Sequence, residues 1–453
     1  MSPDSTPSAK PPSLERSKVC VIIGHGIEAI TSAVVLASLG QVVHLHADQT
    51  LLKRQLQQYG FEHHLHALWQ LYVQQQQIVS LAIAPNAEAL IATYEVSLAH
   101  KSAERIGATF YWLFLDSTQS IWSDDTWLAA FNHSHEQKLP IIISGSQALG
   151  QASLLAQRLQ RAWVYYVPFI FLKDGDAFSS MLNPSLWLLG EKTPNSSQHL
   201  PVLQTLMRHA NTYHCADIAT IEFARSSIMA MLATRVSIMN EMSRLADSYQ
   251  VDIQQVSHIV GLDERVGSSY LQAGWGFGGN TLPAELTQLE QAGHASRVEM
   301  PILKAVRYIN EDQKELIFRK FWQYFDGFID HKTVVIWGAS YKAGSGRTAG
   351  SAIHPLLHLL WSYNITTLVY GDKAQAELSA LYHEQPLLQL IDSPYEQLDR
   401  AQAIFIISWS PQADLDAARL NQQAIPIFDA QNALTRTQVT TLIGDYIGIG
   451  RAK

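Results

Sequence analysis

The stretch that decides the fold is Lys18–Ala29, which reads KVCVIIGHGIEA. Its first seven residues are a nearly continuous apolar run rich in β-branched side chains, which predicts a strand covered on both faces. The pattern G-x-G-x-x-A follows at Gly24 and leads into an apolar helix that ends near Gly40. A strand, this turn and a helix in that order are the signature of a dinucleotide-binding α/β unit.

Each small residue of this turn has its own task. Gly24 makes the tight turn, Gly26 lets a pyrophosphate approach the backbone, and Ala29 allows the helix to pack on the strand. The helix N-terminus adds unpaired N–H donors. A second strand ends near Asp48, where a carboxylate would bind ribose hydroxyls and favour NAD over NADP. The alternative is a Rossmann scaffold that no longer binds NAD.

Further apolar strands alternate with helical or polar stretches along the rest of the chain. They are expected at about 110–115, 140–143 and 163–168, and again at 333–338, 368–372, 403–408 and 425–429. A long helical pattern separates the two series, at about 217–248. This alternation predicts an α/β protein with two Rossmann-like, doubly wound parallel sheets joined by a central helical region.

Length and composition restrict the classes of function. A chain of 453 residues is expected to hold two or three domains, and its net charge of −8 makes nucleic acid an unsuitable partner. Cys20 and Cys215 are far apart, and His63, His64 and His66 belong to a polar helical pattern, so we expect no disulfide and no metal site. The first 17 residues predict a disordered tail. No run approaches a membrane span, and a cytoplasmic protein is expected.

A second glycine-rich stretch, GWGFGGNTLPAE at Gly274–Glu285, is called the glycine-rich loop below. Its glycines would let a ligand lie against main-chain N–H groups; an irregular turn between two helices is the alternative. The loop resembles the catalytic loop GFGGSCxPKD of the UDP-glucose/GDP-mannose dehydrogenase family. The resemblance extends along nearly the whole chain, through a GxDxRIG-like motif at Gly261–Gly267 and a YxGxGR motif at 446–451.

The resemblance implies a set of catalytic positions whose residues differ from the family's. Thr281 stands at the position of the family's nucleophilic Cys, Arg225 at a Lys, Met229 at an Asn and Glu285 at an Asp. The resembling enzymes oxidise a sugar C6 twice with two NAD, and the second step passes through a thioester. A Thr hydroxyl is a far weaker acid than a thiol, and an Arg side chain cannot shuttle a proton as Lys does. We therefore expect this step to be lost or strongly impaired.

The resemblance also implies binding residues. For a UDP-sugar they are Arg265, which reaches across a dimer interface in that family, Phe277, Gly278, Gly279, Tyr341, Lys342 and Arg451. For NAD they are the Gly24–Ala29 turn, with Ser117 or Thr118 near the nicotinamide; the family's ribose-binding acid would fall at Ala47, one place before Asp48.

Four segments follow from these expectations: a disordered tail (1–17), an NAD-binding Rossmann-like domain (18–205), a central helical dimerisation domain (206–315) and a UDP-sugar-binding α/β domain (325–453). Three functions remain open. The favoured one is a pseudoenzyme, a dehydrogenase homologue that binds NAD and a UDP-sugar without normal catalysis. It would act as a ligand-binding or regulatory subunit, with an active relative as one candidate partner, and would form a homodimer or higher oligomer. The second is an active NAD-dependent dehydrogenase making a UDP-uronate for polysaccharide biosynthesis. The third is a scaffold that binds no small molecule.

Overall fold

The computed structural model describes residues 17–94, 106–115, 125–133, 139–145, 148–170, 172–410 and 413–451. The expected tail, apart from Ser17, and the expected nicotinamide contacts Ser117 and Thr118 lie outside the described residues. Ser17 itself is the first residue of β1.

The N-terminal unit contains an eight-stranded sheet in the order β3-β2-β1-β4-β5-β6-β7-β8. The strands are β1 (Ser17–Ile23), β2 (Val43–Ala47), β3 (Ile78–Ala82), β4 (Ile106–Phe114), β5 (Ile141–Ser144), β6 (Val164–Tyr166), β7 (Leu186–Glu191) and β8 (Thr212–Asp217). Its first six strands have the order of a dinucleotide-binding fold. All neighbouring pairs are parallel except β6 and β7. An antiparallel pairing beyond a parallel sheet is common in doubly wound folds.

Helices cover both faces of this sheet, which explains the nearly continuous apolar sequence of β1. Cys20 and Ile22 point into one core, while Val19, Val21 and Ile23 point into the other. The first core is covered by α1 (Ile27–Ser38), α3 (His63–Gln74), α8 (Ala177–Leu182) and α9 (Pro201–His209). The second is covered by α4 (Ala87–Tyr94), α6 (Asp125–His133) and α7 (Gln151–Arg158). The short helix α2 (Gln49–Gln58) follows β2.

The C-terminal unit repeats the same six-strand order as β11-β10-β9-β12-β13-β14, with every pair parallel. Its strands are β9 (Thr333–Trp337), β10 (Thr366–Tyr370), β11 (Leu388–Leu390), β12 (Ala403–Ile406), β13 (Ile427–Asp429) and β14 (Tyr446–Gly448). Its helices are α14 (Ile353–Ser362), α15 (Gln375–Leu381), α16 (Ala417–Gln423) and α17 (Arg436–Thr440). Residues 338–352, between β9 and α14, are called the β9–α14 loop below.

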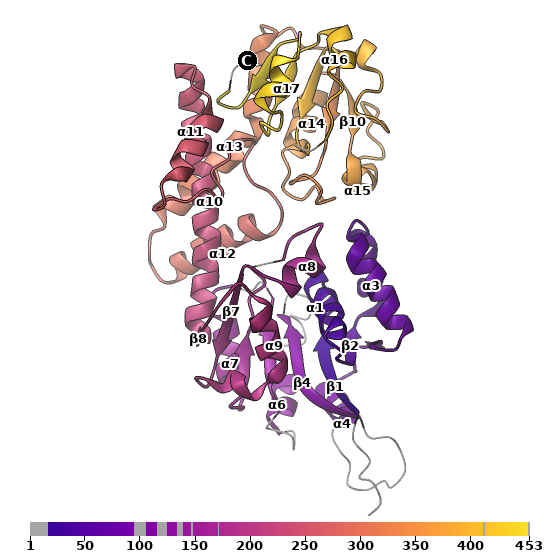
Figure 1. Ribbon diagram of the computed structural model, residues 1–453, viewed down its shortest axis with the longest axis vertical. Helices are drawn as coiled ribbons and strands as arrows, with labels where there is room; N and C mark the ends of the chain where they lie inside the picture. The colour runs from indigo at the N-terminus through magenta and orange to yellow at the C-terminus, as the bar shows by residue number, and fades with distance from the viewer. Residues whose placement is uncertain are drawn as a thin grey trace, which may run out of the picture.

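Four helices join the two units: α10 (Ile218–Tyr249), α11 (Ile253–Leu262), α12 (Thr281–Ala295) and α13 (Pro301–Tyr324). Helix α10 runs along one side of the molecule from the N-terminal sheet towards the C-terminal unit (Figure 1). Its buried face includes Arg225, Met229, Val236 and Met239, in agreement with the helical spacing of the sequence.

The prediction of two Rossmann-like sheets joined by a helical region is confirmed. Among the described residues, no helix is both long and apolar enough to cross a membrane.

Candidate functional site

Buried side-chain amides fix the shape of the glycine-rich loop. Asn240 of α10 accepts a hydrogen bond from Gly274 N at 2.9 Å, and Gln313 of α13 donates to the oxygen of the same residue at 2.9 Å. Asn310 of α13 bonds both sides of Phe277, accepting from its N–H at 2.8 Å and donating to its oxygen at 3.1 Å. Phe277, an expected substrate contact, is therefore a buried anchor of the loop.

Two glycines let this loop touch the C-terminal unit. A Cβ on Gly278 would lie 2.6 Å from the oxygen of Gly350, and a Cβ on Gly279, whose φ is +76°, would lie 2.9 Å from the Tyr341 ring. The N–H of Gly279 donates to Ala349 O at 2.7 Å. The close approach that glycine permits is thus made to the β9–α14 loop.

Thr281 is exposed and is the first residue of α12, where first-turn N–H groups have no intrahelical partner. Within the part of the chain that the structure describes, no hydrogen bond joins its hydroxyl to a His, Asp or Glu side chain. Met229, at the family's Asn position, is buried on α10 and has only a weakly accepting thioether. Neither side chain supplies a proton acceptor of the strength that attack by a hydroxyl needs.

Arg225 and Glu285 form an ion pair between α10 and α12. Both side chains are about 95% buried or more, and Ser226 Oγ donates to the second carboxylate oxygen of Glu285. Burial opposes the charge on Arg225, but the Glu285 carboxylate outweighs it, with help from Tyr166, and raises the pKa of the guanidinium. Arg225 is therefore a permanent cation here and cannot act as an acid–base group.

Glu222 and Tyr166 are two further ionisable residues in this region. Glu222, one turn before Arg225 on α10, accepts from Ala152 N at 3.0 Å and from Ser153 Oγ at 2.7 Å. It thereby satisfies N–H groups in the first turn of α7. Burial raises the pKa of the Tyr166 hydroxyl, which Arg225 partly offsets. Glu222 is thus committed to holding α7.

The turn after β1 has the backbone that the sequence predicts. Gly24 has φ +152°, Gly26 caps α1 without a side-chain contact, and Ala29 is fully buried against the sheet. Asp48, expected at a ribose, is the N-cap of α2: its Oδ1 accepts from Thr50 N at 2.9 Å and Leu51 N at 3.0 Å. One of its carboxylate oxygens is therefore already engaged in helix capping.

Three further expected binding residues differ in burial and in the partners they contact. Arg265 is 88% exposed and pairs with Asp263 two residues away. Arg451 is buried and donates to Leu434 O at 2.5 Å, so it anchors the end of the chain. Lys342 is exposed on the β9–α14 loop. Within the described ranges, no group of three or more His, Cys, Asp or Glu side chains could hold a metal ion.

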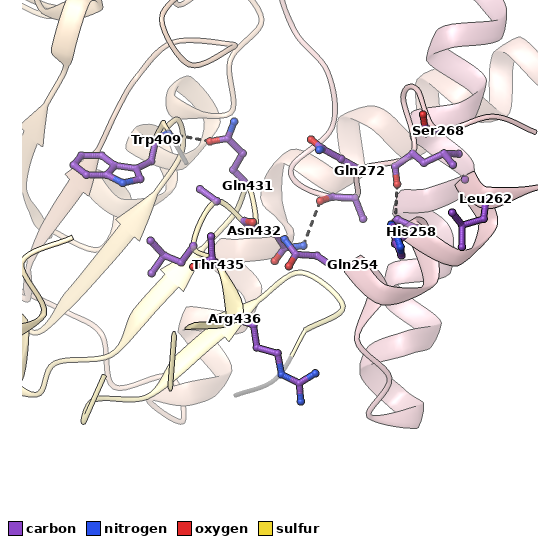
Figure 2. Close-up of a pocket in the computed structure, with 16 residues that line it drawn as sticks. Gln254, His258, Leu262, Ser268, Gln272, Trp409, Gln431, Asn432, Thr435 and Arg436 are labelled. Atoms are coloured by element: carbon purple, nitrogen blue, oxygen red, sulfur yellow. Dashed lines mark hydrogen bonds between the residues drawn. The ribbon is translucent and has the colours of Figure 1, made fainter. Parts of the chain in front are cut away.

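A cavity of about 590 Å³ lies between α11 and the segments that directly follow β12 and β13. In Figure 2, Gln254, His258 and Leu262 of α11 lie on one side, and Gln431 and Thr435 of the C-terminal unit on the other. The wall also includes Leu271, Gln272 and Ala273, which immediately precede the glycine-rich loop. Ligands of open α/β sheets bind at the carboxyl ends of strands, and this volume is typical of a small-molecule site.

Sequence reasoning missed this cavity and the amides that hold the loop. Gln431 and Trp409 come directly after predicted strands, so the position of ligands in α/β sheets could have indicated them. Asn240, Asn310 and Gln313 are polar residues on otherwise buried helix faces, which is the signal of a satisfied internal contact.

Two sheets with the strand order of the dinucleotide-binding fold, joined by a long helix, define a two-unit class of α/β protein. The central-domain model of the UDP-glucose/GDP-mannose dehydrogenase family matches residues 219–312. UDP-glucose 6-dehydrogenase of Pseudomonas aeruginosa is 29% identical over 62% of this chain and 64% of its own. The enzyme of the same name from Rickettsia bellii is 26% identical over 62% and 65%. In its central region and over about three fifths of its length, the chain is similar to the UDP-glucose/GDP-mannose dehydrogenase family.

Solved structures support the same fold over a longer span. A UDP-glucose dehydrogenase from Pyrobaculum islandicum superimposes with a TM-score of 0.77 at 18% identity, over 98% of this chain and 100% of that one. The UDP-D-ManNAc dehydrogenase of Pyrococcus horikoshii gives 0.71 at 15% identity, over 96% and 99%. In sequence, the matches span less than two thirds of the length of the Pseudomonas and Rickettsia relatives.

Proposed function

We propose that this protein binds a nucleotide sugar and NAD as a family member that lacks the Cys-dependent two-step oxidation. The observation that carries this proposal is the buried contact of Arg225 with Glu285, braced by Ser226. This ion pair occupies the charged groups at two of the expected catalytic positions. At a third position Thr281 stands where a thiol would react. Loss of several members of one catalytic unit costs about 10³-fold or more in rate.

The sugar nucleotide would lie in the cavity between α11 and the C-terminal sheet. Amide side chains of Gln254, Gln272 and Gln431 can donate to and accept from base and sugar oxygens. Arg436, an exposed cation among the lining residues, could pair with a diphosphate. The adjoining glycine-rich loop would then receive the sugar end of the ligand.

NAD would lie at the turn after β1. The residues present fit a pyrophosphate, since Gly24 and Gly26 carry no side chain and the first turn of α1 directs N–H groups at it. When bound, NAD would accept a hydride from the substrate. Glu28 places a negative charge in that first turn, and Asp48 is partly engaged in capping α2. Both features weaken binding of the dinucleotide rather than abolish it.

The protein would act as a dimer through α10. The exposed side of this helix carries the apolar residues Met231, Ile238, Met242, Leu245 and Tyr249, spaced by three, four or seven. Such a stripe is typical of a helix that packs on a second helix. A homodimer would cover it and bring each Arg265 towards the other copy.

The decisive experiment measures NADH formation at 340 nm with UDP-glucose, together with calorimetric binding of the sugar nucleotide. We expect binding without turnover for the native chain and for Thr281→Cys. We expect turnover only in a variant that also carries Arg225→Lys, Met229→Asn and Glu285→Asp, because these side chains act as a unit. Turnover by the native chain would establish the alternative, an active dehydrogenase producing a UDP-uronate. Failure to bind either ligand would favour the third function, a scaffold that binds no small molecule.

A further inference from the structure

The β9–α14 loop reaches from the C-terminal unit onto the N-terminal unit. The Tyr341 hydroxyl donates to Asp174 Oδ2 at 2.8 Å, and Arg347 Nη1 donates to the Tyr59 hydroxyl at 2.5 Å. The guanidinium of Arg347 also lies over the Tyr59 ring, 5.0 Å from its centroid. These contacts join segments 167 and 288 residues apart in the sequence.

The backbone of the two segments is shaped for this contact. A Cβ on Gly346, whose φ is +65°, would lie 2.6 Å from the Phe61 ring, and a Cβ on Gly175 would lie 3.2 Å from the oxygen of Gly344. On the receiving side, buried Glu62 accepts hydrogen bonds from Gly175 N and, at 3.1 Å, from Ala177 N. The segments before α3 and before α8 are therefore held together as one contact surface. It lies at the end of the N-terminal unit that faces the C-terminal unit (Figure 1).

The loop is anchored firmly on its own unit. Glu377 of α15 accepts from Thr348 Oγ1 at 2.8 Å and from Thr348 N at 3.2 Å. His354 Nε2 lies 2.9 Å from Thr348 O. Ala349 O accepts from Gly279 N at 2.7 Å, which couples the loop to the glycine-rich loop. A displacement of Tyr341 or Arg347 would therefore be transmitted to the residues around Thr281.

We propose that Tyr341 and Arg347 are an interdomain latch that holds the N-terminal and C-terminal units against each other. Both hydroxyls in the latch are neutral donors or acceptors at neutral pH, because burial raises the pKa of Tyr59 and of Tyr341. The hydrogen bond of Tyr341 to Asp174 is thus one between a neutral donor and a carboxylate. The latch goes beyond the proposed function and does not depend on whether NAD or a sugar nucleotide binds.

Hydrogen exchange on the full-length, ligand-free protein tests the latch. The double variant Tyr341→Phe with Tyr59→Phe removes both hydroxyls and keeps both rings, so the fold is preserved. We expect amides at 59–62 and 174–177 to exchange roughly tenfold faster, because two hydrogen bonds between the units, one of them to a carboxylate, are lost. Exchange in β1 and β9 should not change, and the radius of gyration in solution should increase.

The matched control is Tyr324→Phe. Tyr324 also donates from its hydroxyl to an Asp, Asp445 Oδ2, at 2.8 Å, but both residues lie outside the N-terminal unit. This variant should leave exchange at 59–62 and 174–177 as in the native chain. Equal exchange in the double variant and the native chain would overturn the latch. So would a uniform increase that includes β1 and β9, because that reports a loss of global stability instead of an opening.

Discussion

Arg225 and Glu285 are 60 residues apart in the sequence and form an ion pair in the interior, between α10 and α12. Inside the protein, the guanidinium and the Ser226 hydroxyl take the place of water as hydrogen-bond partners of the Glu285 carboxylate. Breaking a buried pair from one side leaves an uncompensated charge, which costs about 3–5 kcal/mol.

Arg225→Met should therefore lower the free energy of unfolding by roughly 3–5 kcal/mol in urea titrations. Arg265→Met removes an Arg–Asp pair at the surface and serves as the control, with no measurable change expected. Equal effects of the two substitutions would mean that the Arg225–Glu285 contact does not hold the two helices together.

His46 should make the protein less stable in mild acid. Its ring is buried at the end of β2, with Nε2 2.7 Å from the Tyr94 hydroxyl. Burial, with a smaller effect of His44, lowers the pKa of His46 from 6.5 to about 4. The unfolded chain therefore binds a proton between pH 6.5 and pH 4 that the folded chain does not, and stability falls as the pH falls through this window.

The loss from this group approaches about 3 kcal/mol near pH 4, at about 1.36 kcal/mol for each pKa unit. His46→Gln, which keeps a polar partner for Tyr94, should flatten the dependence of the unfolding free energy on pH between 6.5 and 4. Replacing the exposed His63 by Gln should leave the slope as in the native chain. A native slope in His46→Gln would show that folding does not lower the pKa of His46.

The cavity beside α11 should lose its ligand when an indole fills it. Gln272 lines the cavity and is exposed, so Gln272→Trp can enter it without disturbing the core. We expect calorimetry to show UDP-glucose binding at least about tenfold weaker, which is about 1.4 kcal/mol. Gln70→Trp, at an exposed position on α3, is the control. Unchanged binding in Gln272→Trp would place the sugar nucleotide elsewhere.

The stripe on α10 should govern the oligomeric state. Ile238→Glu puts a charge at its centre, where burial in a helix–helix contact would be costly. Analytical ultracentrifugation should give a dimer for the native chain and a monomer for the variant. Glu in place of the exposed Gln70 should leave the dimer intact. If the native chain is a monomer, α10 does not form a subunit interface.

Much of the architecture could be predicted from local patterns. The apolar run at 18–24 predicted a strand with two covered faces, and β1 alternates its side chains between two cores. The same reasoning located β5, β6, β9, β12 and β13, and helix α10. It missed β3, β7, β8, β11 and β14, of which β7 and β11 contain no β-branched residue. It also did not anticipate that β7 lies antiparallel to β6. Strand direction depends on the path of the connection, which the local pattern does not contain.

The sequence by itself determined the two nucleotide-fold sheets, the fingerprint turn and the identity of the residues at Thr281, Arg225, Met229 and Glu285, because these depend on short-range periodicity and on side-chain chemistry. Only the tertiary structure decided that Arg225 is paired with Glu285, that Asp48 caps a helix, and that Tyr341 is bound to Asp174. Each of these contacts joins polar or charged side chains that could form hydrogen bonds or ion pairs with several different partners. Which partner is near is set by the packing of whole helices and sheets, whose long-range geometry no local pattern specifies.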